Sequence, residues 1–213
     1  MLTVIIDYDS GNLHSASKAF ERMAQETNAG EVRVSADPAM VAKADRLVLP
    51  GDGAFPACRK ALAESDVFET MIEAVLERGR PFFGICVGMQ LMATRGLEHE
   101  TSRGLDWIHG DVKAIVPSDP ALKIPHMGWN TLDRQKPHPV LDGIETGPDG
   151  LHAYFVHSYH MQVLQPEQRL AHVGYDGEIT AIIGHDNLLG VQFHPEKSQK
   201  TGLKLIANFL KWA

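Results

Sequence analysis

The stretch that decides the fold reads Pro81-Phe82-Phe83-Gly84-Ile85-Cys86-Val87-Gly88-Met89-Gln90-Leu91-Met92. Its apolar run stops at a cysteine with glycines two residues before and two residues after it, and apolar residues then resume with helical spacing. The pattern predicts a strand, a sharp turn that carries Cys86, and a helix. A nucleophile elbow of the G-x-S-x-G type requires the same arrangement, with cysteine here in place of serine.

Two interpretations of Cys86 are open at this point. A strained turn would lift the sulfur clear of the sheet, and the N-terminus of the following helix would favour the thiolate, which is the nucleophilic form. Alternatively, Cys86 is a buried cysteine between packing glycines. Cys58 lies inside an expected helix and has the surroundings of an ordinary cysteine. Cys86 therefore needs a base elsewhere in the chain before it can be assigned to catalysis.

Composition and charge limit the class of protein. The 213 residues suffice for one substantial core, and we expect a single domain over residues 1–213. The net charge of −7 argues against nucleic acid as the main partner. No apolar run is long enough to span a bilayer, and no signal-like segment opens the chain. The two cysteines have unlike surroundings and do not form a disulfide framework, so we expect a cytoplasmic protein.

Short strands and helices alternate through the first half of the chain. Strands are expected at 2–7, 32–34 and 45–50, and helices follow the turn at 10–12, Pro38 and the glycines near 51–53. A further helix is expected over 67–77, before the strand at 82–85. This order predicts an α/β fold with an open, mostly parallel central sheet flanked by helices. In such sheets ligands bind beyond the carboxyl ends of the strands.

The second half of the chain predicts an additional antiparallel strand region. Expected strands cover 110–116, 126–132, 151–159, 168–173, 179–184 and 188–193, and a last helix covers about 198–212. Residues 133–150 are rich in Pro, Gly and Asp and are expected to form an exposed connection.

A second loop at the carboxyl end of the sheet carries candidate oxyanion donors. Gly51 and Gly53 flank Asp52 directly after the third strand, and such spacing allows backbone N–H groups to face an open site. An acyl-transfer enzyme needs these donors for its tetrahedral intermediate. The N–H of Val87, which follows the elbow cysteine, would be the second donor. Taken alone, the loop favours an ordinary turn between a strand and a helix.

The base is expected in Val191-Gln192-Phe193-His194-Pro195-Glu196. The motif follows a strand, so the two-residue alternation points His194 and Glu196 to the same side. A carboxylate beside an imidazole holds its tautomer and stabilises the imidazolium. A salt-bridged surface pair is the other interpretation. None of the eleven histidines falls in a metal-binding motif, so we expect no metal and no cofactor.

At this point the motifs resemble a known family. Gly84-Ile85-Cys86-Val87-Gly88-Met89-Gln90 together with Phe193-His194-Pro195-Glu196 is similar to the class I (triad) glutamine amidotransferases. A narrower resemblance, to the glutaminase subunits of imidazole glycerol phosphate synthase, rests on segments at 6–8, 11–13, 50–55, 126–130, 154–159 and 192–198. The segments reach from the first strand to the last helix, so the resemblance covers nearly the whole chain.

The resemblance implies the following roles. Cys86 attacks the carboxamide of glutamine, His194 protonates the leaving ammonia with Glu196 as its partner, and water hydrolyses the glutamyl thioester. The expected substrate-binding residues are Gly51, Gln90, Glu98, Ser158 and Tyr159. The ammonia passes to a (β/α)₈ cyclase subunit in histidine synthesis. The expected interface residues are Asn12, Trp129, Tyr154 and Lys197.

Two departures from the family pattern lie near the oxyanion loop. Asp52 replaces a small apolar residue, and Asp9-Ser10 replaces a turn that contains glycine. We expect Asp52 to alter how the loop changes conformation without abolishing activity. Alternatives are an amidotransferase of pyridoxal phosphate or anthranilate synthesis, and an interaction subunit with an inactive triad. Gln90 and the segment 127–130 argue against the pyridoxal branch. A thiol peptidase is disfavoured because no peptide-groove motif is present.

Overall fold

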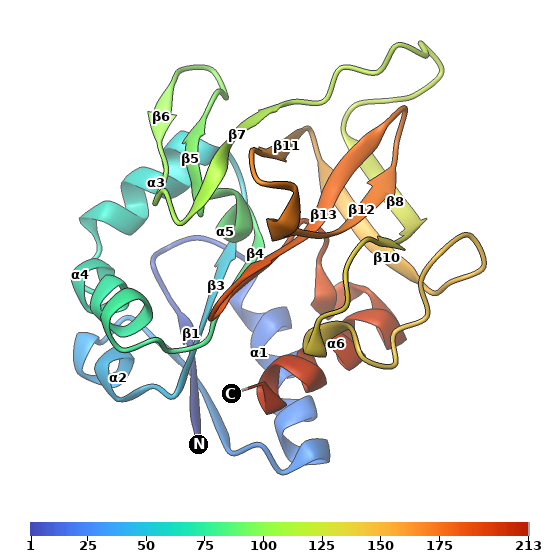
Figure 1. Ribbon diagram of the computed structural model, residues 1–213. Coiled ribbons are helices and arrows are strands. Elements are labelled where there is room, and N and C mark those ends of the chain that lie inside the picture. The colour runs from blue at the N-terminus through green and yellow to red at the C-terminus, as the bar shows by residue number, and fades with distance from the viewer. Residues whose placement is uncertain (213) are drawn as a thin grey trace.

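The computed structural model describes residues 1–212, and within them a central sheet of eight strands organises the molecule (Figure 1). The strand order is β2-β1-β3-β4-β14-β13-β12-β9. The first five are parallel and the last three antiparallel. Their bounds are β2 Glu31–Ser35, β1 Leu2–Ile6, β3 Arg46–Gly51, β4 Phe82–Cys86, β14 Leu188–Val191, β13 Glu178–His185, β12 Arg169–Gly174 and β9 Asp133–Arg134.

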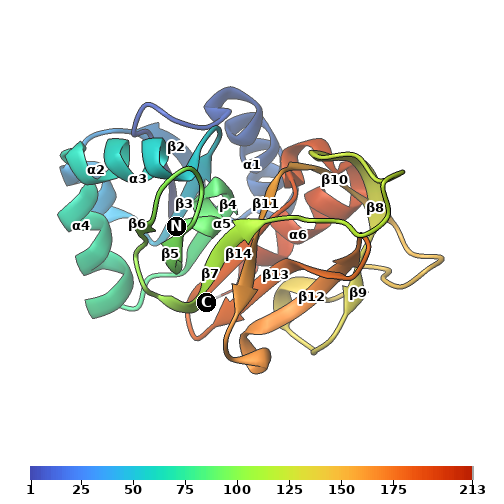
Figure 2. The same ribbon diagram turned by 90° about the horizontal axis from the view of Figure 1, so that it is seen from above.

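Helices cover the parallel part of the sheet in two layers, as the view from above shows (Figure 2). On one side α1 (Leu13–Thr27) packs against α6 (Gln199–Lys211). On the other side lie α2 (Pro38–Lys43), α3 (Phe55–Glu64) and α4 (Phe68–Ile72), which continues as a π-helix over Glu73–Glu77. The predicted α/β architecture, with a mostly parallel sheet between helices, is confirmed.

Local sequence explains where these helices begin. The Asn12 side chain accepts the N–H of Ser15 at the start of α1, and Asp37 accepts the N–H of Ala39 at the start of α2. Pro38 occupies the first turn of α2, where its missing N–H costs nothing. Buried Phe20 on α1 packs against Phe83 of β4 and Phe209 of α6, so one apolar core joins both helices to the sheet.

Two smaller sheets extend the structure beyond the carboxyl ends of the parallel strands (Figure 1). One contains β11 (Tyr159–Val163), β7 (Ile108–Ala114), β5 (Ala93–Gly96) and β6 (Ser102–Arg103). The other pairs β10 (His152–His157) with β8 (His126–Thr131) in antiparallel register. The predicted antiparallel region is therefore present, although β5 and β7 are parallel to each other.

Three local elements differ from expectation in their extent. The helix after Cys86, α5, covers only Val87–Gln90, because the carbonyl of Leu91 accepts the N–H of Leu105 and that of Met92 accepts those of Trp107 and Ile108 instead of continuing a helix. The strand expected over 151–159 is interrupted at Ser158, where β10 ends and β11 begins. Residues 133–150 are not simply an exposed connection, because they contain β9 and a 3₁₀ turn (Pro139–Leu141) whose Val140 and Leu141 are buried.

Further 3₁₀ turns cover Pro166–Gln168 and Pro195–Lys197. Of the helices formed by residues 1–212, none has the length and apolar character needed to cross a bilayer.

Candidate active site

Cys86 lies on a strained turn at the carboxyl end of β4, directly before α5 (Figure 1). Its φ of 54° and ψ of −112° are unusual for a residue with a side chain. Such conformations cost about 1–3 kcal/mol and persist only where the surrounding structure imposes them. The sulfur is buried and forms no disulfide. The strand, sharp turn and helix predicted from the sequence are therefore present, with Cys86 at the turn.

The two glycines of the elbow are required by close backbone contacts. A Cβ at Gly88 would collide with the carbonyl oxygen of Leu49 on β3. A Cβ at Gly84 would lie 2.7 Å from the carbonyl oxygen of Gly88. Real Cβ atoms are not found at such distances, so the turn can lie this close to the sheet only with glycine at both positions.

His194 and Glu196 meet at the turn that precedes α6. Nδ1 of His194 and Oε1 of Glu196 are 2.9 Å apart, and both side chains are buried. The geometric expectation was right, but its reason was wrong. Strand β14 ends at Val191, and the 3₁₀ turn Pro195–Lys197 brings the two side chains together instead of strand alternation.

The electrostatics of His194 depend on its two acidic neighbours. Burial by itself would lower the pKa of His194, but hydrogen bonds and Coulombic attraction to Cys86 and Glu196 outweigh it and raise the pKa to about 10. At neutral pH the imidazole is therefore charged beside the cysteine. A charged imidazole beside a cysteine, oriented by a carboxylate, is an arrangement suited to nucleophilic thiol catalysis.

Backbone hydrogen bonds hold the His194 turn against β10. The N–H of His194 donates to the carbonyl of Tyr154 at 3.0 Å, and the N–H of Tyr154 donates to Oγ of Ser198 at 2.9 Å. The Ser198 hydroxyl in turn donates to the carbonyl of His194 at 2.6 Å. Helix α6 also packs closely, since a Cβ at Gly202 would collide with the carbonyl oxygen of Pro195. The turn is thus fixed from both sides.

The candidate oxyanion loop begins beside Cys86, because Gly51 is the register partner of Cys86 between β3 and β4. Gly53 has a φ of 102°, which only glycine adopts readily, and Val87 is the first residue of α5. The Asp52 side chain is exposed, but its backbone is held. Its N–H donates to Oγ of Ser10 at 3.3 Å, and the hydroxyl of Ser10 lies 3.1 Å from its carbonyl.

Two further side chains restrain this loop. The thiol of Cys58 donates to the carbonyl of Asp52 at 3.2 Å, and the hydroxyl of Tyr8 donates to the carbonyl of Pro50 at 2.8 Å. Burial raises the pKa of both Cys58 and Tyr8, so each keeps its proton and acts as a donor. Together with Ser10, which departs from the family pattern, these side chains hold the backbone of the loop from its outer side.

Among the expected substrate-binding residues, Gln90 and Tyr159 meet and Glu98 contacts the loop. The amide Nε2 of Gln90 donates to the carbonyl of Tyr159 at 3.1 Å. Oε2 of Glu98 accepts the N–H of Phe55 at 2.7 Å, at the start of α3 and the end of the oxyanion loop. Ser158 is half-buried at the junction of β10 and β11, and its carbonyl accepts the N–H of Ile115.

Sequence reasoning missed Gln192, although it stands two residues before His194. Its side chain is fully buried, and its Nε2 lies 3.8 Å from Sγ of Cys86. Its Oε1 accepts a hydrogen bond from Nε2 of Gln90 at 3.0 Å. The only hint in the sequence was a polar amide directly before the candidate base His194. The residues around Gln192 by themselves indicate only a strand.

A buried histidine pair, His126 and His157, was also missed. Nδ1 of His126 and Nε2 of His157 are 3.0 Å apart, and Nδ1 of His157 lies 2.8 Å from the carbonyl of Tyr159. The ring of His126 stacks between Phe155 and Tyr175. Burial lowers the pKa of His126 to about 4 and that of His157 to about 3, so both are neutral at pH 7.

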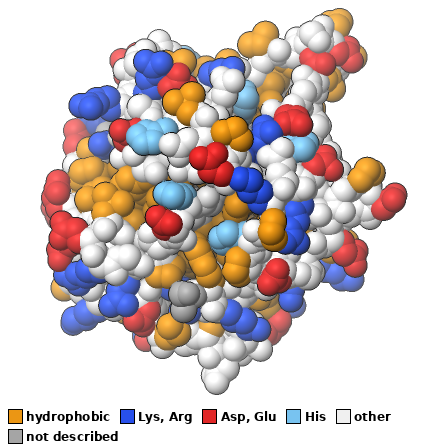
Figure 3. Space-filling view, in the orientation of Figure 1, with side chains coloured by type: hydrophobic (Ala, Val, Ile, Leu, Met, Phe, Trp, Pro, Cys, Tyr) orange, Lys and Arg blue, Asp and Glu red, His pale blue; other side chains and the backbone are white. Residues whose placement is uncertain are grey.

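The expected interface residues lie on separate elements near this end of the molecule. The ring of Trp129 on β8 contacts that of Tyr154 on β10, with centroids 5.6 Å apart, and Trp129 remains 48% exposed. Asn12 caps α1, and Lys197 is exposed at the end of the 3₁₀ turn that carries Glu196. On the face drawn in Figure 3, acidic and basic side chains are interspersed, without an extended basic patch.

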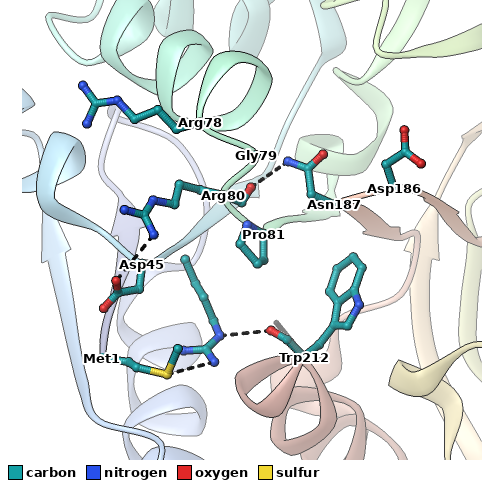
Figure 4. Close-up of a pocket in the computed structure, with 10 residues that line it drawn as sticks. Met1, Asp45, Arg78, Gly79, Arg80, Pro81, Asp186, Asn187 and Trp212 are labelled. Atoms are coloured by element: carbon teal, nitrogen blue, oxygen red, sulfur yellow. Dashed lines mark hydrogen bonds and ion pairs between the residues drawn. The ribbon is translucent and has the colours of Figure 1, made fainter.

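A cavity of about 430 Å³ lies at the opposite end of the sheet (Figure 4). Its walls include Pro81, Trp212 and Arg46, and the last of these opens β3 at its amino end. Buried Arg46 donates through Nε to the carbonyl of Trp212 at 3.4 Å, and burial lowers its pKa. Because Cys86 lies at the carboxyl end of β4, this cavity does not belong to the thiol site. Residues 1–212 contain no group of three or more His, Cys, Asp or Glu side chains placed to hold a metal.

Comparison with known proteins identifies the class that this fold and site define. The family model described as "Glutamine amidotransferase class-I" matches residues 4–212. A solved glutamine amidotransferase shares the fold with a TM-score of 0.72 at 17% identity, over 98% of this chain and 99% of that chain. The structure of PurLQS from Thermotoga maritima gives a TM-score of 0.70 at 16% identity, over 99% of this chain and 97% of that chain. The chain belongs to the class I glutamine amidotransferases.

Curated relatives place it more narrowly. The chain is 66% identical to the imidazole glycerol phosphate synthase subunit HisH of Cereibacter sphaeroides, over 100% of this chain and 99% of that protein. It is 61% identical to the HisH subunit of Ruegeria pomeroyi and 57% identical to that of Rhizobium meliloti, with the same coverage. Within the class, the chain is thus a member of the HisH group of glutaminase subunits, as the sequence motifs predicted.

Proposed function

We propose that Cys86, His194 and Glu196 form the triad with which this glutaminase subunit releases ammonia from L-glutamine. The Cys86 thiolate attacks the carboxamide carbon, and His194 gives its proton to the departing nitrogen. Ammonia leaves, and a glutamyl thioester remains. Water, deprotonated by His194, then cleaves the thioester and releases glutamate. The observation that carries the proposal is the buried pair of His194 and Glu196, 2.9 Å apart, beside Cys86, which together with Glu196 raises the pKa of His194.

The oxyanion of each tetrahedral intermediate needs backbone donors, for which Val87 and Gly53 are the candidates. Val87 directly follows the nucleophile, and Gly53 lies in the loop that leaves β3 beside it. A single donor is typically worth about 10²–10³ in rate. For the amino-acid end of glutamine we propose Gly51, Gln90, Glu98, Ser158 and Tyr159. No cofactor is needed for this chemistry.

We infer further that the ammonia is delivered to a (β/α)₈ cyclase subunit in histidine synthesis, in a cytoplasmic heterodimer. The names of the relatives, each of them a synthase subunit, support a partner. The surface that we assign to it carries Asn12, Trp129, Tyr154 and Lys197. The carbonyl of Tyr154 accepts the N–H of His194, a contact that supports a docking surface next to the triad. Residues 1–213 act as one unit in this proposal.

The test is steady-state glutamate release by the purified chain, alone and with the cyclase partner and its ribotide ligand. We expect negligible turnover alone and strong stimulation by the loaded partner. Equally high activity in isolation would contradict the partner assignment. Absence of glutamate under both conditions would favour an inactive interaction subunit instead. Stimulation only by an anthranilate or pyridoxal phosphate synthase subunit would move the chain to another branch of the class.

A further inference from the structure

The neighbour of Cys86 with no assigned role is Gln192, which lies between β14 and the His194 turn. Its side chain is fully buried, and its two polar atoms have different partners. Nε2 lies 3.8 Å from Sγ of Cys86, within the range of an N–H···S hydrogen bond. Oε1 accepts from Nε2 of Gln90 at 3.0 Å. One end of this amide thus contacts the reacting sulfur, and the other is held by another side chain.

The direction of the Gln192 amide follows from a backbone carbonyl two hydrogen bonds away. The carbonyl oxygen of Tyr159 can only accept, so Gln90 must turn its NH₂ group towards it. The second hydrogen of that NH₂ group donates to Gln192, which must therefore present its oxygen to Gln90. The NH₂ group of Gln192 is left facing the sulfur of Cys86. The reverse orientation would place an oxygen lone pair against a thiolate.

The histidine pair fixes the carbonyl from which this order starts. Nδ1 of His157 faces the carbonyl of Tyr159, so it carries the proton and donates. In the neutral ring Nε2 then accepts, and His126 must donate from its own Nδ1. Stacking between Phe155 and Tyr175 holds the His126 ring in place. The polar groups from His126 to Cys86 therefore form one connected network in which every donor and acceptor is fixed. The Tyr159 carbonyl accepts from His157 and from Gln90, and Gln90 also donates to Gln192.

We propose that Gln192 is a catalytic residue that donates an N–H to the Cys86 thiolate, and that Gln90 and the Tyr159 carbonyl set the orientation of its amide. The donor contributes when negative charge resides on sulfur, before attack and again when the thioester is cleaved. This inference rests on the proposed function, because it assigns a further residue to the same nucleophile. It adds a stabilising group from the His194 segment that belongs to neither the triad nor the oxyanion loop.

The test measures the pH dependence of Cys86 alkylation by iodoacetamide in the chain alone, with mass spectrometry of the peptide that carries Cys86. Because only the thiolate reacts, the midpoint of this profile reports the thiol pKa. In Gln192→Met we expect the midpoint to rise by about 1 unit, since an apolar side chain of similar size replaces the donor. Gln192→Glu, which keeps the shape but places a carboxylate there, should raise it further. An unchanged midpoint in both variants would overturn the proposal.

A matched control and a kinetic readout separate this role from a structural one. Gln168 is another buried amide, located in the 3₁₀ turn before β12, and Gln168→Met should leave the midpoint unchanged. With the partner present, Gln192→Met should lower kcat by about 10–10²-fold while KM for glutamine changes less than about threefold. A rise in KM with wild-type kcat and midpoint would mean that Gln192 only supports substrate binding, and would reject the proposal.

The orientation argument has its own test in Gln90→Met, which removes the group that aligns Gln192 without touching the sulfur. We expect a midpoint between those of the wild type and Gln192→Met, because Gln192 then samples both amide orientations. A wild-type midpoint would show that Gln90 does not set the direction. None of the alkylation measurements requires glutamine turnover, so their failure is distinguishable from failure of the proposed function.

Discussion

The two cysteines of this chain lie in regions that differ in chemistry but hardly in burial. Cys58 on α3 is 3% exposed and Cys86 on the elbow is 5% exposed, and neither forms a disulfide. The Cys58 thiol donates to the carbonyl of Asp52 and lies 3.2 Å from the Ser10 hydroxyl. Cys86 faces a charged imidazole, His194, and the amide NH₂ group of Gln192.

Because their exposures are nearly equal, the two sulfurs differ in the groups that surround them. Burial raises the pKa of Cys58, which keeps its proton and donates to a carbonyl oxygen. Donors and a cation favour the thiolate. The backbone differs in the same sense. Cys58 lies within a regular helix, whereas Cys86 is held in a strained turn. The predictions below test this contrast, beginning with the largest expected effect.

Exchanging each cysteine separately tests the contrast most directly. In Cys86→Ala we expect glutamate release to fall by about 10³-fold or more, because no other group can form the thioester. Synthesis from free ammonia by the complex should persist. Cys58→Ser, which keeps a donor for the Asp52 carbonyl, should change activity at most a few-fold. Loss of ammonia-dependent synthesis in Cys86→Ala would contradict the division of labour between the subunits.

The carboxylate behind His194 should have the next largest effect. Glu196→Gln keeps the size of the side chain but removes the charge that stabilises the imidazolium and holds its tautomer. We expect kcat to fall by about 10²–10⁴-fold, with a smaller change in KM. Glutamate release under saturating partner is the measurement. Glu100→Gln, an exposed carboxylate well separated along the chain, is the control, and equal losses in both variants would argue against a specific role.

The smallest expected effect concerns the histidines that stay neutral. The folded-state pKa values of His126 and His157, about 4 and about 3, lie below the ordinary value of 6.5. Between pH 6.5 and about 4 the unfolded chain therefore takes up protons that the folded chain does not. The two histidines therefore make their full contribution to the free energy of unfolding above pH 6.5. As the pH falls below 6.5, that free energy should decrease by up to about 1.4 kcal/mol per pH unit for each histidine.

Urea unfolding of His126→Phe between pH 4.5 and 7.5 checks this expectation. The variant keeps a stacked ring and should be less stable near neutral pH, because His157 loses its donor, and this difference should shrink as the pH falls. Below pH 6.5 its free energy of unfolding should change less steeply with pH than that of the wild type, by the amount that corresponds to one proton. His152→Phe, on the exposed end of β10, should show the wild-type slope. Parallel curves for His126→Phe and the wild type would show that His126 is not held neutral by the fold.

Much of the fold and the candidate site could be predicted because the signals are local. The β-branched run before Asp7, the glycines around Cys86 and the spacing within α1 and α6 each identify an element within a few residues. The glycines at the elbow also single out Cys86 as the proposed nucleophile. When a cysteine lies at the carboxyl end of a parallel strand, its base is expected at the end of a neighbouring strand, and few residues of the sequence meet that condition.

The features that could not be predicted depend on contacts between distant segments. Helix α5 ends at Gln90 because the next carbonyls bond to residues 105–108. The His194–Glu196 pairing depends on a 3₁₀ turn that α6 and β10 hold, and strand alternation gave the right neighbours for the wrong reason. The orientation of the Gln192 side-chain amide is set by the Tyr159 carbonyl through Gln90. Nothing in the sequence indicates that these residues are connected.

The contact of Gly88 with Leu49 has a consequence for protein engineering. Because the backbone of β3 occupies the space where a side chain would project from position 88, substitutions there cannot be used to reshape the thiol's surroundings. Libraries aimed at new acyl donors should therefore keep residues 84–88 invariant. Variation belongs at Ser158, Tyr159 and Glu98, whose side chains are only half-buried.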